Sequence, residues 1–412
     1  MSRSYQYTSP DRVLRLLLKD TNLHVIFSVT LMAVLGVSSI TPILPRVAEL
    51  FHKTPQGVAL LIVAFTLPGA LFTPVMGVLG DRVGRKKVLV PSLVLFAVAG
   101  AACGLARDFE TLVALRLLQG VGSAALGAIN VTLLGDLYKG TERAAAMGYN
   151  ASVLSVGTGV YPAVGGALAV LGWYYPFFLP VLALPVALAV VLVLDNPEPK
   201  VTGSLREYIR VTLKAIWHPQ VVVLFATSVV TFVLIYGSFL AYFPFLLEES
   251  FNASPVFIGF VMAAASIATA FAAFWVGGLA DRFGSRALVK TGFVLYILSL
   301  VLLPLAHNLW TLSVPVLLFG IANGLNVPSI LTVLNDYAPD EYRAAFMSMN
   351  GMVLRLGQTL GPLLVGIAVE LVGMVGSFFV SAGLAVVMLV IMIPILQQEP
   401  APPQFSRSVG LD

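Results

Sequence analysis

Residues 77–87 read GVLGDRVGRKK, and residues 277–287 repeat the pattern as GGLADRFGSRA. Asp, Glu, Lys and Arg make up only 11% of the chain, against roughly 25% in an average soluble protein. The first segment nevertheless gathers charge on Asp81, Arg82, Arg85, Lys86 and Lys87. Because a similar segment recurs 200 residues later, the sequence indicates two related halves.

Apolar runs dominate the rest of the sequence. The 412 residues are 58% hydrophobic, with a mean hydropathy of +0.93, which leaves too little polar sequence to cover a surface that faces water. A helix that spans a bilayer needs about 20 mostly apolar residues. We expect an all-α polytopic membrane protein with twelve transmembrane helices, because the runs are too long for the alternating strands of a barrel. The expected spans are 23–44, 57–79, 88–106, 110–134, 145–170, 174–194, 220–246, 256–279, 287–306, 309–334, 346–370 and 374–396.

A shift of 200 residues aligns the sequence with itself in three segments. The matched positions include Asp81/Asp281, Asp136/Asp336, Asn150/Asn350, Gly157/Gly357 and Pro162/Pro362. Six spans per half would give both halves one orientation, so we expect two six-helix bundles related by a parallel, pseudo-two-fold repeat. The expected domains are a cytoplasmic N-terminal segment (1–21), a first bundle (22–194), a cytoplasmic linker (195–219), a second bundle (220–397) and a cytoplasmic tail (398–412). The segment 1–21 and the linker have amphipathic patterns typical of helices on the membrane surface, with partner binding as the alternative.

Basic residues predict the orientation. The loops on one side hold only Arg46, Lys53 and Arg107, whereas nearly all other Lys and Arg residues fall in loops on the opposite side. By the positive-inside rule, both termini are expected in the cytoplasm of a multi-pass protein of the cell inner membrane. The basic residues are spread over short loops rather than gathered in one patch, so no nucleic-acid partner is expected.

Several function classes find no support in the sequence. Cys103 is the one cysteine, which excludes an intrachain disulfide, and no Cys/His cluster suggests a metal. The chain shows no nucleotide-binding loop, nucleophile elbow or cofactor fingerprint. We therefore expect no enzyme activity, no cofactor and no metal, and any active transport would draw on an ion gradient.

Three motifs resemble a known family. GVLGDRVGRKK matches G-x-L-x-D-R-x-G-R-[RK], the signature loop between spans 2 and 3 of the major facilitator superfamily. RLLQGVGSAA (116–125) resembles the R-x-x-Q-G-x-G motif of its span 4. GYNASVLSVGTGVYPAVGG (148–166) is similar to the antiporter motif G-x8-G-x3-G-P-x2-G-G, except that Tyr161 stands where the family has Gly. The resemblance covers the whole chain and implies the twelve-span drug:proton antiporter branch.

The signature loop is expected to act as a cytoplasmic gate. In the family its Asp caps the N-terminus of span 11, where a helix dipole favours a carboxylate. The hypothesis is that Asp81 makes this contact when the cytoplasmic side is closed, and that Arg85 pairs with Asp136. Gly77 would let a neighbouring helix approach. A loop that only sets topology is the alternative. The gate set is Gly77, Asp81, Arg82, Gly84, Arg85, Asp136, Asp281, Arg282 and Asp336.

The span 5 motif is expected to form a hinge. Small residues allow close helix contact, and proline removes a helix hydrogen bond, so span 5 could bend and pack against span 8. Ordinary tight packing is the alternative, and the two interpretations barely exclude each other. The hinge set is Gly157, Tyr161, Pro162, Gly165 and Gly166.

Two arginines fall within spans, where a charge is costly and indicates function. The resemblance implies that Arg116, with Gln119 of the same motif, contacts span 1 backbone and takes part in proton coupling. Arg355 on span 11 would attract an anionic or strongly polar substrate group, with a salt bridge or a bond to carbonyls as the alternative. No Asp or Glu lies mid-span; Glu370 is nearest. The branch usually carries such a carboxylate.

A substrate cavity is expected among spans 1, 4, 7, 10 and 11. An aromatic wall with few polar groups suits an amphiphilic ligand, and a lipid-facing stripe on span 7 is the alternative. The expected substrate-binding residues are Arg355, Gln358, Asn326, Asn323, Tyr236, Phe239 and Phe232.

The function favoured by the sequence is secondary active transport by alternating access, as proton-coupled efflux of an amphiphilic or drug-like small molecule. The expected partners are this small molecule, protons as the coupling ion and membrane lipids, and the protein is expected to be a monomer. The first alternative is a facilitator or exchanger of an organic anion, sugar or lipid headgroup bound by Arg355. A second is a non-transporting membrane sensor on the same scaffold.

Overall fold

The computed structural model describes residues 20–195, 219–337 and 343–396. Within these ranges the chain forms helices and short connections, without strands. The surface helices expected at 1–21 and 195–219, and the tail 398–412, lie outside the described residues except for a few terminal positions. The described residues form two compact units: unit 1 contains 20–54, 60–195 and 254–263, and unit 2 contains 55–59, 219–253, 264–337 and 343–396.

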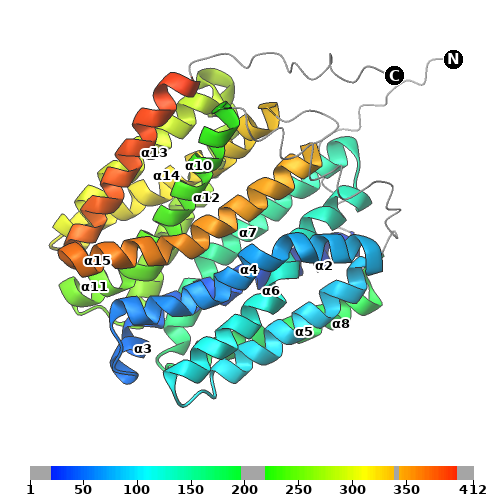
Figure 1. Ribbon diagram of the computed structural model, residues 1–412, viewed down its shortest axis with the longest axis horizontal. Helices are drawn as coiled ribbons and strands as arrows, with labels where there is room; N and C mark the ends of the chain where they lie inside the picture. Colours follow the sequence, from blue (N-terminus) through cyan, green and yellow to red (C-terminus); the bar gives the residue numbers. More distant parts are fainter. Residues whose placement is uncertain (1–19, 196–218, 338–342, 397–412) are drawn as a thin grey trace. The chain divides into compact units, whose positions relative to one another are not determined.

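Unit 1 is built on a broken first helix. α2 ends at Ser38, a 3-10 turn η1 (Thr41–Ile43) follows, and α3 then continues the path; Pro42 and Pro45 explain the break, because proline cannot donate the helix hydrogen bond. In this unit α5 packs on α6 and α8, and α2 on α6 and α7 (Figure 1). Its helices are α2 (Thr21–Ser38), α3 (Leu44–Leu50), α4 (Pro55–Val83, from Leu60 on), α5 (Arg85–Cys103), α6 (Phe109–Leu137), α7 (Gly140–Leu168), η2 (Tyr175–Leu182) and α8 (Ala183–Leu192).

Unit 2 also begins with an irregular helix. α10 (Pro219–Val233) runs into η3, a π-helical segment from Leu234 to Tyr242, before the α-helical form resumes in α11. The π-helix is rare and frequently marks a functional site. The other helices are α11 (Phe243–Phe251), α12 (Pro255–Phe283, from Ala264 on), α13 (Ser285–Leu302), η4 (Leu303–Leu305), α14 (Leu309–Tyr337) and α15 (Arg343–Leu396).

Several helices recur at the spacing found in the sequence. α4 and α12 begin and end 200 residues apart, as do α6 and α14. Their packing recurs as well: a Cβ atom at Gly120 would collide with the carbonyl oxygen of Phe65, and one at Gly320 with that of Ala265. A residue in α6 and the residue 200 positions later therefore occupy matching places on helices of equal length.

Eleven helices in the described ranges are long and apolar enough to cross a membrane, against the twelve expected. The difference lies in α15, whose stretch Met349–Pro394 counts once. Inside this helix Gly373 has φ 77° and ψ 174°, a backbone conformation that interrupts the helix and that glycine adopts readily. α15 therefore consists of two helical segments that meet at Gly373.

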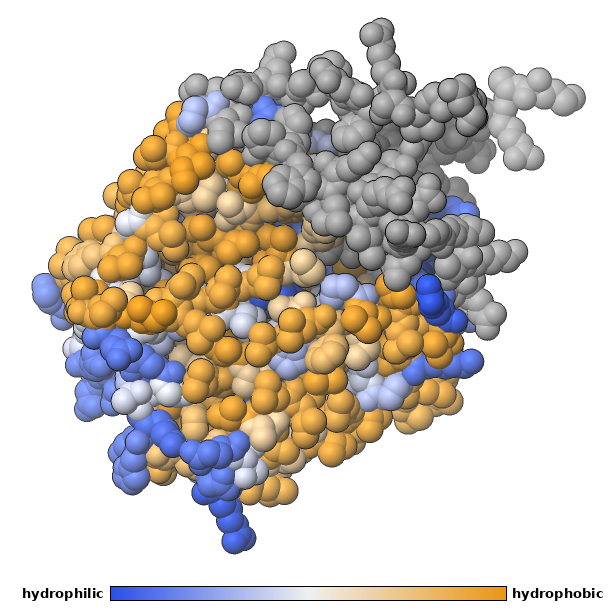
Figure 2. Space-filling view, viewed as in Figure 1, coloured by the Kyte–Doolittle hydropathy of each residue, from blue (hydrophilic) through white to orange (hydrophobic). Residues whose placement is uncertain are grey.

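The surface of both units is apolar. Large side chains such as Phe274 and Leu371 are more than three-quarters exposed, and hydrophobic residues cover most of the described surface in this view (Figure 2). Exposed apolar patches of this extent do not occur on soluble monomers. Together with the eleven apolar helices, they identify a polytopic membrane protein.

Candidate functional site

The helix that carries Arg116 starts at a well-defined cap. Asp108 precedes α6, and its carboxylate accepts hydrogen bonds from the backbone N–H of Thr111 at 2.8 Å and from its hydroxyl at 2.9 Å. The backbone bond from Thr111 lowers the pKa of the Asp108 carboxyl. A cap of this type fixes the first turn of a helix, so it sets the register of Arg116 two turns later.

Arg116 is buried with few partners for its charge. Its side chain is 1% exposed, and Nε donates to the carbonyl oxygen of Leu61 on α4 at 3.1 Å. Nη1 donates to Oε1 of Gln119 at 2.7 Å, and the guanidinium carbon lies 4.5 Å from the centre of the Phe65 ring. Nη2 of Arg116 and Nε2 of Gln119 have no hydrogen-bond partner within the described part of the chain. The site therefore holds a buried cation and two free donors.

The contact of Arg116 differs from the expected one. The resemblance implied a contact with the backbone of span 1, whereas Arg116 reaches the backbone of α4, the second helix of the unit. Gly120 accounts for the difference, because a Cβ atom there would collide with the carbonyl of Phe65 on α4. Its absence lets α4 come close to α6 beside Arg116. Gly122 does the same for α5, since a Cβ atom there would collide with the backbone of Phe96.

The charged signature segment sits at the joint between α4 and α5. Gly84 has φ 110°, which only glycine adopts without strain, and it permits the turn. Arg85 is 3% exposed and pairs with Asp136 on α6, as hypothesised; Nη2 also lies 3.4 Å from the carboxylate of Asp81. Arg85 therefore joins α4, α5 and α6 at one end of unit 1.

The remaining gate residues make fewer of the expected contacts. Asp281 and Arg282 are exposed on α12, and the side chain of Asp336 lies outside the described residues. A Cβ atom at Gly77 would meet no described atom within 4 Å, so the close helix approach expected there is not seen. At position 285 unit 2 has Ser in place of Arg, and the neighbouring Arg286 donates to the Tyr337 hydroxyl at 3.2 Å.

The hinge residues make close backbone contacts within unit 1. A Cβ atom at Gly165 would collide with the carbonyl of Ser39 at the break in the first helix, and one at Gly166 with the carbonyl of Pro255. Gly157 faces the side chains of Leu31 and Val34. Pro162 lies inside α7, and Tyr161 is half-buried. The motif thus packs α7 on α2 and on the first turns of α12, which belong to the same unit.

In unit 2 the structure brings together part of the predicted substrate-binding set. Phe232 and Tyr236 stack at 6.1 Å between ring centres, and Tyr236 interacts electrostatically with Arg355 on α15. All three side chains are half-buried. Gln358 and Asn323 are half-buried too. We call Phe232, Tyr236 and Arg355 the unit 2 face.

Two residues of the same set lie in the interior instead. Phe239 is 6% exposed and stacks between Phe243 and Phe319, with ring centres 5.0 Å and 4.4 Å away. Asn326 is fully buried, and neither amide atom has a hydrogen-bond partner among the described residues. The helical stripe predicted on span 7 is therefore split, because the π-helix changes the direction in which successive side chains point.

Sequence reasoning missed a polar cluster in unit 1. Asn130 on α6 donates to the Thr30 hydroxyl on α2, which donates to Oδ1 of Asn150 on α7 at 2.5 Å. The signal was available, since polar residues inside a membrane span are rare and usually paired. We call Thr30, Asn130 and Asn150 the unit 1 triad.

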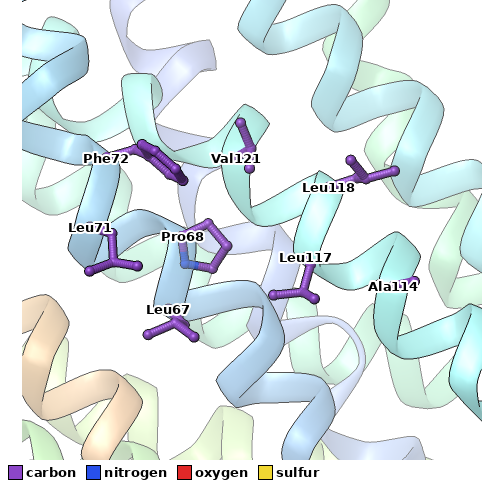
Figure 3. Close-up of a pocket in the computed structure, with 8 residues that line it drawn as sticks. All are labelled: Leu67, Pro68, Leu71, Phe72, Ala114, Leu117, Leu118 and Val121. Carbon is purple, nitrogen blue, oxygen red and sulfur yellow. The ribbon is translucent and has the colours of Figure 1, made fainter.

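An apolar cavity of about 490 Å³ opens between α4 and α6. Figure 3 shows its eight lining side chains, which include Pro68 and Phe72 from α4 and Leu118 and Val121 from α6. All eight are apolar, so the cavity lacks the polar groups that orient a ligand. Arg116 is buried and does not line this cavity.

Known proteins identify the family. The model of the Major Facilitator Superfamily matches residues 26–251 and 236–411, which is nearly the whole chain. The chain belongs to the Major Facilitator Superfamily. It is therefore a transporter and not an enzyme.

Similar proteins include bacterial exporters. The bacillibactin exporter of Bacillus subtilis is 26% identical over 83% of this chain and 88% of its own length. Multidrug resistance protein 2 of the same organism is 26% identical over 84% and 88%. The quinolone resistance protein NorA of Staphylococcus aureus is 25% identical over 81% and 86%.

Solved structures share the fold of this superfamily member. A bacterial homolog of the human lysosomal transporter Spinster gives a TM-score of 0.79 at 18% identity, covering 96% of this chain and all of that one. The nucleoside transporter NupG gives 0.75 at 14% identity, covering 92% and 100%.

Proposed function

We propose that this transporter exports an amphiphilic, drug-like small molecule in exchange for protons, by alternating access. The observation that carries the proposal is the Arg116 site, where a cation is 1% exposed, and where Nη2 of Arg116 and Nε2 of Gln119 have no partner among the described residues. Such a group in a membrane helix is costly and is kept for function. The free N–H groups of Arg116 and Gln119 can donate to a water or to a substrate oxygen that enters during the cycle.

The relatives support export. Three of the similar proteins are named as a bacillibactin exporter, a multidrug resistance protein and a quinolone resistance protein. Each matches more than four-fifths of this chain. Identity of about one quarter leaves the substrate open, so the substrate class is part of the proposal.

Twelve spans suit this function. The stretch Met349–Pro394 has 46 residues, and a continuous helix of that length would extend about 69 Å, more than twice the ~30 Å hydrocarbon core. We therefore count its segments on either side of Gly373 as two spans. This gives six spans per half, two bundles in parallel orientation, and both termini in the cytoplasm of the bacterial inner membrane.

The gate and hinge residues keep their proposed roles. Arg85 and Asp136 hold the ends of α5 and α6 together, and Asp81, which shares Arg85, is the residue that can exchange this partner for the N-terminus of span 11. Gly165 and Gly166 make the contacts about which α7 would bend. The protein would act as a monomer in contact with membrane lipids.

The test uses everted membrane vesicles with an inside-acid proton gradient. Lipophilic cations, neutral amphiphiles and organic anions are added in turn, and collapse of the gradient is followed by a pH-sensitive dye. We expect one compound class to dissipate the gradient with the wild type and to fail with Arg116→Ala. Failure of every class would contradict proton-coupled export.

Two variants control this experiment. Arg107→Ala removes an exposed arginine in the loop just before α6, so it should leave exchange unchanged. Arg116→Lys keeps the charge but loses the planar guanidinium that serves Leu61 and Gln119 together, and lysine does not replace such a fork. Exchange by Arg116→Lys at the wild-type rate would show that charge alone suffices.

The unit 2 face favours a second candidate function, the facilitated passage or exchange of an organic anion, sugar or lipid headgroup. Arg355 lies within electrostatic range of Tyr236, and no carboxylate is paired with it among the described residues. A guanidinium beside a stacked aromatic pair suits a planar anion.

Uptake of a labelled organic anion separates the two functions. The second candidate predicts uptake without a proton gradient, lost in Arg355→Ala and retained in Arg116→Ala. The first candidate, proton-coupled export, predicts instead that transport is lost in Arg116→Ala. Loss of uptake in both variants with correct membrane insertion would mean that the two arginines serve one coupled cycle.

A further inference from the structure

Each unit ties a late helix to its first helix through an asparagine. In unit 1, Oδ1 of Asn150 on α7 accepts from the Thr30 hydroxyl on α2 at 2.5 Å. In unit 2, Oδ1 of Asn350 on α15 accepts from the Ser228 hydroxyl on α10 at 3.2 Å. The two asparagines are 200 residues apart, so they occupy matching positions.

The third member of the cluster differs between the units. Asn130 on α6 completes the unit 1 triad by donating to Thr30. The position 200 residues later is Ile330 on α14, a helix of the same length that starts and ends at the matching residues. Unit 2 therefore has an apolar side chain where unit 1 has an amide.

A small cavity lies at this place in unit 2. Its wall includes Ser228 and Thr231 from α10, Ile330 from α14 and Asn350 from α15. It leaves about 10 Å³ for the centre of a water-sized sphere, close to the ~10–15 Å³ that one buried water needs. Thr231 is fully buried, and its hydroxyl has no hydrogen-bond partner within the described ranges. The cavity thus has room for one water beside Ser228, Thr231 and Asn350, in a wall that is otherwise apolar.

We propose that this cavity binds one water molecule, which hydrogen-bonds to the Thr231 hydroxyl and to Asn350. The water takes in unit 2 the place of the Asn130 side chain of unit 1, and it joins the first helix of the unit, α10, to the later helix α15. Buried waters of this kind satisfy polar groups that would otherwise cost free energy. Unlike an amide side chain, a water can leave and return.

A monovalent cation is the competing occupant of a neutral-oxygen site. The charge nearby argues against it, because Arg355 lies five residues beyond Asn350 on α15, about 7.5 Å along the helix axis. The cavity wall contains no carboxylate to offset a second positive charge. Water is therefore the occupant that the electrostatics favour.

The water site lies directly behind the unit 2 face. Phe232 lines the cavity and stacks on Tyr236, which interacts with Arg355. A joint held by an exchangeable water can adjust when this face moves. The inference itself concerns water binding and does not depend on which substrate is carried.

Radiolytic hydroxyl-radical labelling of the purified full chain tests the site, since radicals formed from ordered water oxidise the side chains beside it. The reporter is Ile330, which is 3% exposed, and the reference is Ile129, which precedes Asn130 on α6 and is 1% exposed. We expect Ile330 to be labelled several times faster than Ile129. Equal slow labelling of both would overturn the proposal.

Two threonine variants locate the anchor. Thr231→Val keeps the shape but removes the hydroxyl, so labelling of Ile330 should fall to the level of Ile129. Thr227→Val is the control: its hydroxyl donates to the Val223 carbonyl of the same helix at 2.7 Å and does not line the cavity. If Ile330 is still labelled fast in Thr231→Val, the water does not depend on the Thr231 hydroxyl and the proposed hydrogen bond is wrong.

Replacing the water with a side chain gives an independent readout. Ile330→Asn supplies the amide that unit 1 carries, and we expect it to raise the melting temperature and to exclude water, whereas Ile330→Leu should do neither. A wild-type melting temperature that rises with Na⁺ relative to choline, and does so less in Thr231→Val, would show a cation in place of water and overturn the proposal.

Discussion

The two units place different chemistry at matching positions. Where α6 of unit 1 carries Arg116 and Gln119, α14 of unit 2 carries Val316 and Phe319, and all four side chains are at most 2% exposed. In unit 1, Arg116 donates one hydrogen bond to the Leu61 carbonyl of α4 and one to Gln119 on its own helix. In unit 2, Phe319 stacks against Phe239 and Tyr296 instead.

Position 161 and its counterpart 361 show the same contrast. Unit 1 has Tyr161 at this position. The backbone of α7 comes close to the end of α2 four residues later, where Gly165 meets Ser39. Unit 2 has Gly361, where the backbone of α15 meets that of the π-helix at Gly237.

One helix arrangement thus tolerates two kinds of interior. Polar groups in a membrane interior are costly unless they are paired, and unit 1 joins helices through Arg116 and through its triad. At the matching positions unit 2 has stacked rings and glycine contacts. Among the described residues both units keep unpartnered buried atoms, in unit 1 on Arg116 and Gln119 and in unit 2 on Asn326 and Thr231.

The largest expected effect comes from giving unit 1 the residue of unit 2 at position 116. Arg116→Val removes the donors to the Leu61 carbonyl and to Gln119, and each buried acceptor left without a donor costs about 1–3 kcal/mol. We expect a fall of about 3 kcal/mol in the free energy of unfolding, measured by SDS titration in mixed micelles, and loss of substrate–proton exchange. The control Leu117→Val changes a half-exposed neighbour and should alter neither. Exchange that survives Arg116→Val would show that the guanidinium is structural only.

A smaller effect is expected where unit 2 relies on glycine. In Gly361→Ala the new Cβ atom would lie 2.8 Å from the backbone nitrogen of Gly237 and 2.9 Å from the Val233 carbonyl oxygen. Overpacking of a tight interior costs about 2 kcal/mol, so the same titration should show a loss of this size. Gly351→Ala on the same helix meets no described atom within 4 Å and should be neutral or stabilising. A neutral Gly361→Ala would mean that the π-helix shifts freely.

The unit 1 triad should contribute less than either. Asn130→Ile copies the residue of unit 2 and removes the hydrogen bond to Thr30, which is worth about 1 kcal/mol. We expect a loss of that size in the free energy of unfolding. The control Thr132→Val removes a bond within α6, from the Thr132 hydroxyl to the Ala128 carbonyl, and should have a smaller effect. If both variants lost the same free energy of unfolding, the bond between α6 and α2 would stabilise the protein no more than a bond within α6.

Much of the fold could be predicted from the sequence, because apolar runs and a 200-residue spacing report directly on spans and on their order. The helix break at Gly373 shows the limit. The apolar pattern predicts a loop between two spans near this residue. In the structure the helix continues up to Gly373 and resumes directly after it, and only this residue has a positive φ within α15. The π-helix at 234–242 was missed because its hydrogen-bond pattern leaves no periodic mark in a uniformly apolar segment.

The candidate site could be predicted only in part. Arg116 and Arg355 stand out in the sequence because charges inside spans are rare. The residues near them do not, since Leu61 beside Arg116 and Tyr236 beside Arg355 come from other helices and depend on packing. Phe239 looked like a cavity residue because of its spacing, but stacking between Phe243 and Phe319 places it in the interior.

The smallest expected effect compares the caps of α6 and α14. Asp108 accepts a hydrogen bond from the Thr111 N–H at 2.8 Å, and Asn308 accepts one from the Thr311 N–H at 2.9 Å. The bond from Thr111 lowers the pKa of the Asp108 carboxyl. A carboxyl with a lowered pKa in the folded state stabilises the protein above its ordinary pKa of about 4, and this contribution disappears as the pH falls through the lowered value.

Asn308 does not titrate, so the two caps should respond differently to acid. Melting temperatures measured from pH 7 down to about pH 3 should fall further for the wild type than for Asp108→Asn. The reciprocal variant, Asn308→Asp, should fall further than the wild type. Because Asp108 is exposed to solvent, the differences should be small and should shrink in high salt. Melting curves of Asp108→Asn and wild type that stay parallel over this range would show that the cap of α6 acts through its hydrogen bonds alone, as the cap of α14 does.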